Sequence, residues 1–394
     1  MLIGLVGKPS CGKSTFFKAA TLMDVLIAPY PFATIKPNLG VGYVRVKCLC
    51  KDFGVKCTPR TGFCDGETRF VSIDLMDVAG LIKGASEGRG LGNQFLNDLS
   101  KADAFIHIVD ISGTTDDEGR EGKGDPIKDV RMLEEELDLW FFGILNKAWD
   151  VFSRKVQTEK SDFVKAVAKQ FSGINVKEEH VEKAMKKLKF DIENPEKWTK
   201  EQLKEFSHEL RYLTKPMIIA ANKIDKERAE ENLKKLREVF PSVRIIPCSA
   251  DSELSLRQAA KHNLIKYSPG SKDFEIIGNL NKKQKEALEI IKKNVLLKYE
   301  EGTGVQAILD EVVFSLLKHI AVFPAGTNKL TDSQGRILPD CFLVPEGTTA
   351  LSFAYKIHTD LGKNFIKAID VKTKQAIGKE HRLKNNDAIE IVTK

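Results

Sequence analysis

The chain has 394 residues, of which 42% are hydrophobic and 30% are charged, as is ordinary for a globular protein of two or three domains. No apolar run approaches the ~18 residues of a membrane span, and the N-terminus lacks the apolar segment of a secretory signal. We therefore expect a cytoplasmic protein with no membrane partner. The net charge of +7 is compatible with a nucleic-acid partner but does not require one.

The first motif is a glycine-rich loop between an apolar run and a helical pattern. It reads Gly7-Lys8-Pro9-Ser10-Cys11-Gly12-Lys13-Ser14, which has the spacing G-x-x-x-x-G-K-S. Between a strand and a helix, this spacing predicts a loop whose backbone N–H groups, with those of Thr15 and the helix start, bind a triphosphate. We expect Lys13 to reach the outer phosphates and the Ser14 hydroxyl to hold Mg²⁺. A simple glycine turn is the alternative.

Two later positions are candidates for completing the magnesium site. Thr34 lies in a proline-rich loop 20 residues after Ser14, near the distance at which GTPase loops place a metal-binding threonine; alone, it is one turn hydroxyl among many. Residues 70–76 form a strand pattern that ends at Asp77-Val78-Ala79-Gly80. This D-x-x-G motif predicts a carboxylate near Mg²⁺ and a glycine N–H near the γ-phosphate. The next residue is Leu81, so no side chain there orients the attacking water.

A third motif predicts the base of the nucleotide. A buried-strand pattern over residues 217–221 ends at Asn222-Lys223-Ile224-Asp225. The Asp225 carboxylate can accept hydrogen bonds from N1–H and the N2 amino group of guanine, and adenine offers neither donor. We expect Asn222 to tie the loops together and Lys223 to lie over the base. In the later run Cys248-Ser249-Ala250, the Ala250 N–H is placed to donate to guanine O6.

The remaining pattern predicts an α/β fold with additions. Residues 39–46 alternate like an edge strand, and residues 104–109 form a buried parallel strand in which His107 is a core histidine. Helical stripes between residues 129 and 213 predict an inserted helical domain. Residues 253–320 read as helical, and short strands follow, with one helix near residues 350–357. The expected domains are a P-loop domain at 1–128 and 214–320, a helical insertion at 129–213 and a β-rich domain at 321–394.

Four of the seven cysteines lie between residues 48 and 64. Cys48, Cys50, Cys57 and Cys64 have the spacing C-x-C-x6-C-x6-C, without the paired C-x2-C units of common zinc sites. Small buried residues in a β-hairpin, or thiols that oxidise, are the simpler interpretation. A metal site and a redox role remain open alternatives.

The ordered motifs identify a P-loop GTPase, and two runs resemble the Obg family of GTPases more specifically. These runs are Tyr30-Pro31-Phe32-Ala33-Thr34-Ile35-Lys36-Pro37-Asn38 and Asp77-Val78-Ala79-Gly80-Leu81-Ile82-Lys83-Gly84-Ala85. The helical insertion is similar to that of the YchF branch in its archaeal-type form. The C-terminal run Ile357-His358-Thr359-Asp360-Leu361-Gly362 resembles a TGS domain, which has a β-grasp-like fold.

This resemblance implies site residues. Lys13, Thr34 and Gly80 would be catalytic, and Ser14, Thr34 and Asp77 would bind Mg²⁺. The nucleotide contacts would come from residues of the phosphate loop and the guanine loops, namely Gly7, Pro9, Ser10, Cys11, Gly12, Lys13, Ser14, Thr15, Asn222, Lys223, Asp225, Ser249 and Ala250. Many relatives carry asparagine at the position of Ser10, a residue associated with potassium-assisted hydrolysis, so potassium activation stays open.

The resemblance also implies a slow GTPase linked to translation, associated with the ribosome or RNA through the TGS and helical domains. The segment 363–384 contains seven Lys or Arg residues against Asp370 and Glu380, which indicates an RNA-backbone surface or only a solvated face. Two other functions remain open. One is a nucleotide hydrolase with no obligate partner, and the other is an ATP-preferring or redox-responsive stress regulator. The oligomeric state is not predicted.

Overall fold

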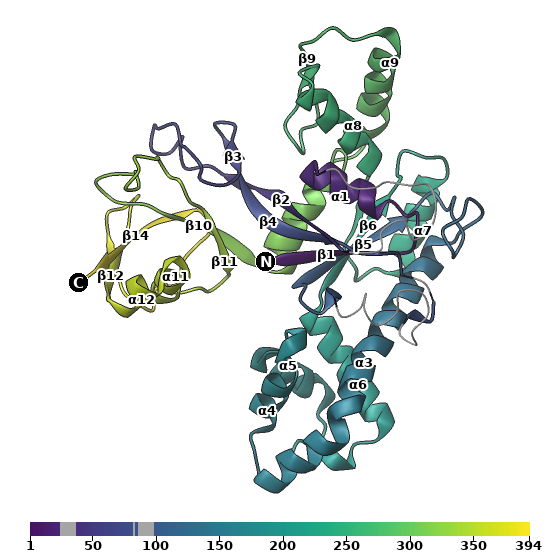
Figure 1. Cartoon of the computed structure of the whole chain (residues 1–394), viewed down its shortest axis with the longest axis vertical. Helices are drawn as coiled ribbons and strands as arrows, with labels where there is room; N and C mark the ends of the chain where they lie inside the picture. Colours follow the sequence, from purple (N-terminus) through teal and green to yellow (C-terminus); the bar gives the residue numbers. More distant parts are fainter. Residues whose placement is uncertain (24–36, 82, 86–97) are drawn as a thin grey trace. The chain divides into compact units, whose positions relative to one another are not determined.

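The computed structural model describes residues 1–23, 37–81, 83–85 and 98–394 (Figure 1). The chain forms two compact units, Met1–Gly40 with Asp74–Ile308 and Val41–Ile73 with Leu309–Lys394. The second unit therefore combines a hairpin from the N-terminal third with the C-terminal residues, whereas the sequence-based boundaries kept this hairpin in the P-loop domain. Thr34 and most of the run from Tyr30 to Asn38 lie outside the described residues.

The central sheet has the strand order β2-β4-β1-β5-β6-β7, and β3 pairs with β4. Its strands are β1 (Leu2–Val6), β2 (Asn38–Lys47), β3 (Phe63–Cys64), β4 (Thr68–Asp77), β5 (Ala104–Asp110), β6 (Met217–Asn222) and β7 (Ile245–Pro247). The pairings of β1 with β4 and β5, of β5 with β6 and of β6 with β7 are parallel. The central strands consist of near-continuous apolar runs. Such runs suit a parallel arrangement, because the strands of a parallel sheet are buried on both faces. The predicted edge position of residues 39–46 is confirmed.

Helices α1 (Lys13–Thr21), α7 (Ala229–Val239) and α8 (Ala250–Lys261) follow strands of this sheet, and α1 packs against α8 (Figure 1). The expectation that residues 253–320 are all helical is wrong for one segment. The short strands β8 (Ile265–Lys266) and β9 (Glu275–Ile276) form an antiparallel pair before helices α9 (Lys282–Ile291) and α10 (Val305–Asp310). Pro269 and Gly270 between the two strands favour a turn.

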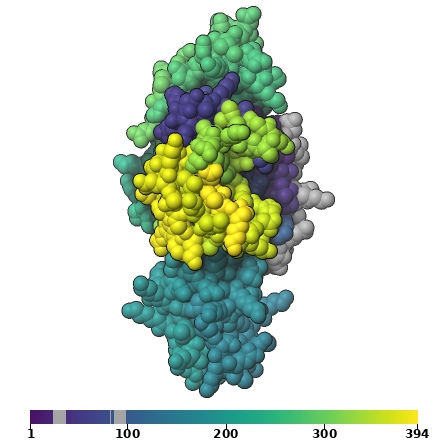
Figure 2. All heavy atoms as spheres, turned by 90° about the vertical axis from the view of Figure 1, so that its left-hand side faces the viewer, coloured from purple at the N-terminus to yellow at the C-terminus, as the bar shows by residue number. Residues whose placement is uncertain are grey.

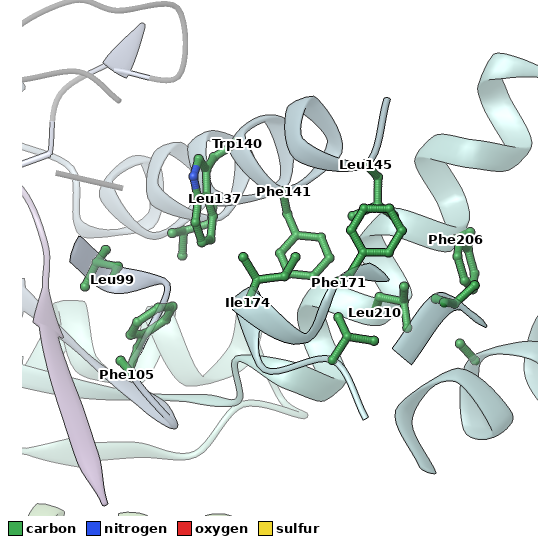
Figure 3. Packing of buried hydrophobic residues seen from close by; sticks show 14 of the residues in the cluster. Leu99, Phe105, Leu137, Trp140, Phe141, Leu145, Phe171, Ile174, Phe206 and Leu210 are labelled. Carbon is green, nitrogen blue, oxygen red and sulfur yellow. The ribbon is translucent and has the colours of Figure 1, made fainter. Parts of the chain in front are cut away.

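The inserted helical segment consists of α3 (Pro126–Glu159), α4 (Phe163–Gln170), α5 (Glu178–Leu188) and α6 (Lys200–Thr214). The capping box predicted at Thr199 and Gln202 is present at the start of α6. Apolar side chains from these helices form one cluster that reaches the sheet at Phe105 of β5 and includes Leu99 from the segment before β5 (Figure 3). The insertion therefore shares a core with the sheet that carries the phosphate loop.

The C-terminal residues form a separate mixed sheet with the order β11-β10-β14-β12-β13. Its strands are β10 (His319–Pro324), β11 (Phe342–Pro345), β12 (Phe365–Asp370), β13 (Ala376–Ile377) and β14 (Asp387–Thr393), and helices α11 (Ala350–Ile357) and α12 (Thr359–Lys363) join β11 to β12. The predicted helix at residues 350–357 is thus confirmed. Figure 2 shows these residues in yellow-green to yellow as one close-packed body.

In the described part of the chain, no helix combines the length and the apolar character needed to cross a membrane.

Candidate functional site

The phosphate loop has a backbone that only glycine can adopt at two positions. Gly7 and Gly12 have φ angles of 149° and 99°. A Cβ atom at Gly7 would lie 2.4 Å from the Ile108 carbonyl oxygen, and one at Gly12 would lie 2.2 Å from Asn222 Nδ2. The motif glycines therefore let the loop approach β5 and the guanine-recognition motif closely.

Lys13 and Ser14 begin α1 and project into the loop and the adjoining strand end. Lys13 Nζ donates to the Lys8 carbonyl oxygen at 2.7 Å, so the ammonium group is held under the loop. Ser14 Oγ donates to Asp77 Oδ2 at 2.8 Å. The structure thus brings the predicted phosphate-binding lysine and two of the predicted magnesium ligands together; Thr34, the third predicted ligand, is outside the described residues.

The environment of Asp77 fits a divalent cation. The side chain is fully buried, and its Oδ1 atom has no hydrogen-bond partner among the described residues. Burial raises the pKa of the carboxyl group, and the Lys13 charge and the Ser14 hydroxyl oppose this shift. Mg²⁺ prefers carboxylate and hydroxyl oxygens, so Ser14 and Asp77 are suitable ligands for it.

The D-x-x-G motif is attached directly to the phosphate loop. The Leu81 N–H donates to the Gly7 carbonyl oxygen at 3.0 Å. A Cβ atom at Gly80 would lie 2.6 Å from the backbone nitrogen of Pro9. The Leu81 side chain is 1% exposed and belongs to the core cluster shared with α3, so it does not point into the nucleotide site.

The predicted guanine-recognition motif is joined to the same loop by Asn222. Its Nδ2 atom donates to the Cys11 carbonyl oxygen at 2.9 Å, and its Oδ1 atom accepts from the Ala250 N–H at 3.1 Å. This Ala250 N–H is the group assigned to guanine O6, and it already has a partner in Asn222. Asp225 Oδ1 accepts a hydrogen bond from Ser249 Oγ at 2.7 Å, which orients the carboxylate.

One residue of this site, Asp110, was missed by the sequence analysis. It lies at the end of β5, where its Oδ2 atom contacts Lys223 Nζ at 2.8 Å and accepts from Thr115 Oγ1 at 2.8 Å. Burial alone would raise the pKa of Asp110, but Lys223 and the hydroxyl donors hold it below its ordinary value. Asp110 therefore positions the lysine of the guanine motif. Its place at the carboxyl end of a parallel strand was the available signal.

A second missed interaction connects the phosphate loop to the helical insertion. Lys8, at a variable position of the motif, is buried and donates from Nζ to the Thr115 carbonyl oxygen at 2.7 Å. The same nitrogen forms an ion pair with Asp129 Oδ2 of α3 at 2.8 Å. Burial raises the pKa of Asp129 to about 6 despite the neighbouring Lys8. No local sequence pattern predicted this pair.

His107 is a core residue, as predicted. It lies in β5 and is 1% exposed, and its Nδ1 atom has no hydrogen-bond partner among the described residues. Burial, together with the Lys13 charge, lowers its pKa to about 3. The imidazole is therefore neutral at physiological pH.

Comparisons with known proteins agree with this geometry. Residues 2–147 match the family described as 50S ribosome-binding GTPase. Residues 220–326 match the Obg-like GTPase YGR210-like, G4 motif-containing domain, and residues 327–393 match the TGS domain.

Individual relatives cover most of the chain. It is 47% identical to the uncharacterized GTP-binding protein MJ1332 of Methanocaldococcus jannaschii, over 100% of this chain and 99% of the relative. It is 30% identical to the ribosome-binding ATPase YchF of Bacillus subtilis, over 93% and 87% of the two chains.

Solved structures of related proteins have the same fold. The GTP binding protein from Pyrococcus horikoshii OT3 superposes with a TM-score of 0.80 at 38% identity, with 100% of both chains covered. The YchF GTPase of Schizosaccharomyces pombe has a TM-score of 0.55 at 22% identity, over 100% of this chain and 97% of the relative, which supports a shared fold.

Proposed function

Because this chain belongs to the YchF branch of the Obg-like GTPase family, with a P-loop GTPase domain and a TGS domain, we propose that it binds GTP with Mg²⁺ and hydrolyses it slowly as a switch in translation. The observation that carries the proposal is the connection of the guanine motif to the phosphate loop through Asn222. This connection supports one continuous site for base recognition and phosphate binding.

The choice of GTP rests on Asp225. Its carboxylate is oriented by Ser249 and partly buried, so a base without N1–H and N2 donors would leave it unpaired. The Lys223 stem is held beside this site by Asp110.

Lys13 and the loop N–H groups would stabilise the negative charge that develops on the transferred phosphoryl group. Phosphate oxygens would replace the Lys8 carbonyl oxygen as the acceptor of Lys13. Ser14 and Asp77, with Thr34, would hold Mg²⁺, which supplies additional positive charge to the phosphates when it is bound.

The attacking water must be positioned without a side chain from residue 81. The burial of Leu81 leaves backbone groups near Gly80 as the internal candidates, with Thr34 or a group supplied by a partner as the others. This arrangement supports slow turnover by the protein alone, because a leucine at residue 81 offers the water no general base.

We further propose that the C-terminal domain contacts ribosomal RNA. All seven basic side chains of segment 363–384 are exposed, and they lie on and around β12 and β13. Such a charge density suits a phosphate backbone. Relatives are named ribosome-binding ATPases, which supports a ribosomal partner and a cytoplasmic location.

Preference for ATP is the second candidate function, and it is favoured by the naming of several relatives as ATPases. Competition of GTP and ATP against a fluorescent GDP analogue tests it directly. We expect GTP to bind at least tenfold more tightly, and Asp225→Asn to remove most of this difference. A tenfold preference for ATP in the unmodified protein would overturn the assignment.

Ribosome co-sedimentation tests the switch. We expect more protein in the ribosomal pellet with a non-hydrolysable GTP analogue than with GDP, and less when Lys367, Lys374 and Lys379 are changed to glutamate. Equal pelleting in both nucleotide states would contradict the proposed switch. Unchanged pelleting of the triple variant would contradict the proposed RNA surface.

A further inference from the structure

The four clustered cysteines come together in space at the end of the β2–β4 hairpin. Cys48 and Cys50 follow β2, Cys57 lies in the next loop, and Cys64 ends β3. Their four sulfur atoms lie within 4.8 Å of one another. The distance is 3.6 Å from Cys48 Sγ to Cys57 Sγ and 4.0 Å from Cys50 Sγ to Cys64 Sγ.

These separations agree with ligands of a single metal ion. A disulfide would need sulfur atoms about 2.05 Å apart. A zinc ion with four thiolates at about 2.3 Å in tetrahedral geometry places its sulfur atoms about 3.8 Å apart. A polynuclear iron–sulfur cluster distributes its cysteines over several irons and therefore spreads them more widely.

The surroundings of the thiols also suit a closed site. Cys48, Cys50 and Cys57 are buried, so solvent has little access to them. The Gly66 N–H lies 3.3 Å from Cys64 Sγ and donates to it, an interaction that stabilises a thiolate ligand. The Cys48 N–H donates to the Glu67 carbonyl oxygen at 2.7 Å, which fixes the backbone of the first ligand.

Between its first and last cysteine the loop has three basic residues and one acidic residue, a charge that partly offsets that of such a site. Four thiolates around a divalent cation carry two net negative charges. Lys47, Lys51 and Lys56 lie within the ligand loop or directly before it, and each side chain is exposed.

We propose that Cys48, Cys50, Cys57 and Cys64 bind one zinc ion in a closed, tetrahedral structural site. All four positions around the ion are taken by sulfur, so none remains for a substrate or a catalytic water. The site is separate in sequence and chemistry from the nucleotide-binding residues.

The ion would fix a loop that holds the C-terminal domain. Residues 58–63 lie between two of the ligands and contact the loop before β11. The Thr58 N–H donates to the Ile337 carbonyl oxygen at 2.8 Å, and the Arg60 N–H donates to the Pro339 carbonyl oxygen at 2.9 Å. Arg60 also pairs with Asp332 at 3.3 Å. Zinc therefore stabilises the second compact unit at its join between the hairpin and the TGS domain.

Elemental analysis of the full-length protein, purified under reducing conditions without added metal, tests the proposal. We expect about one zinc per chain, and replacement by Co²⁺ should give the visible absorption bands of a tetrahedral tetrathiolate complex. Less than about 0.2 zinc per chain, together with no cobalt spectrum from fully reduced thiols, would overturn the proposal. So would a mass spectrum showing two native disulfides, or stoichiometric iron in place of zinc.

Substitutions assign the ligands. Cys57→Ser should lower zinc content at least fivefold, and Cys341→Ser should leave it unchanged, because Cys341 is a free cysteine of the same unit outside the cluster. If Cys57→Ser does not fold, the metal content and cobalt spectrum of the unmodified protein still decide the question. These measurements need no nucleotide, so their failure is distinguishable from failure of the proposed GTPase function.

Discussion

At the scale of single residues, Gly80 is a position where the D-x-x-G motif lies directly against the backbone of Pro9. A Cβ atom at Gly80 would lie 2.6 Å from the Pro9 nitrogen and 2.7 Å from Pro9 Cα, and these backbone atoms cannot rotate away. The proposed contact of Gly80 with the γ-phosphate therefore depends on the absence of a side chain.

Gly80→Ala should push the motif away from the loop and break the bond from the Leu81 N–H to the Gly7 carbonyl oxygen. We expect single-turnover GTP hydrolysis to fall about tenfold or more and GDP affinity to change less than about threefold. The matched control is Gly143→Ala, on an exposed position of α3 with open space around its Cβ. It should leave hydrolysis unchanged and stabilise the fold by about 0.5–1 kcal/mol. Equal hydrolysis by both variants would contradict the sensor role.

His107 makes stability depend on pH through a single side chain. Its folded-state pKa of about 3 lies below the ordinary value of 6.5, so below pH 6.5 the unfolded state binds more protons than the folded state. Stability is therefore lost as pH falls from 6.5 toward 3.

Replacing the imidazole removes this contribution. We expect the free energy of unfolding of His107→Leu, relative to the unmodified protein, to rise by about 1.4 kcal/mol per unit of pH decrease below 6.5. Denaturant titrations of both proteins at pH 7.5, 6.0 and 5.0 would measure this difference in the free energy of unfolding. A difference that is constant with pH would show that the imidazole is not buried in its neutral form.

At the scale of elements, α3 is the part that ties the inserted helices to the nucleotide site. Its first turn carries Asp129, which pairs with Lys8 of the phosphate loop, and its middle carries Trp149. The Trp149 ring stacks on Trp198 with centroids 5.2 Å apart and contacts Phe163 and Phe206. Helix α3 thus contacts the phosphate loop at its start and contributes to the aromatic cluster of the insertion farther along.

Trp149→Ala should cost about 3–5 kcal/mol of stability, because it removes one of the two indole rings of this cluster and leaves a cavity. Val151→Ala, on the same helix but 78% exposed, should change stability by less than about 0.5 kcal/mol. Chemical unfolding followed by far-ultraviolet circular dichroism measures both. A cost below about 1 kcal/mol for Trp149→Ala would mean that the ring is not a packing centre.

At the scale of the whole molecule, the chain has two compact units with separate hydrophobic cores. The described nucleotide-site residues all belong to the first unit, and the proposed zinc ligands all belong to the second. Ligands of the two sites should therefore stabilise different parts of the protein.

Calorimetry should resolve two unfolding transitions that respond to different ligands. GDP with Mg²⁺ at about 100 times its dissociation constant should stabilise one transition by about 2.7 kcal/mol. A zinc chelator should lower the unfolding temperature of the other transition and leave the stabilisation by GDP unchanged. Asp225→Asn serves as the control, because it should lose the GDP effect and keep the chelator effect. A single transition that both ligands move together would contradict this independence.

Much of the fold was predictable because its signals are local. The glycine spacing around Gly12, the D-x-x-G after β4 and the N-K-x-D after β6 each encode a strand end and a specific chemistry within a few residues. The same holds for β10, β11, β12 and β14 of the C-terminal domain, whereas β13 and the pairing order were not predicted. The hairpin of β8 and β9 was missed because its strands have only two residues each. Two residues are too few to show the alternation of apolar and polar side chains that indicates a strand.

The sequence by itself thus determined the protein class and predicted the motifs for phosphate, magnesium and guanine, because each motif consists of neighbouring residues whose backbone geometry is local. Only the tertiary structure decided which distant side chains complete the sites. It paired Lys8 with Asp129 and Lys223 with Asp110, and it joined residues 41–73 to the C-terminal unit. It also brought four unusually spaced cysteines within 4.8 Å, because the pairing of β3 with β4 and the loops beside it, rather than a short C-x2-C turn, holds them together.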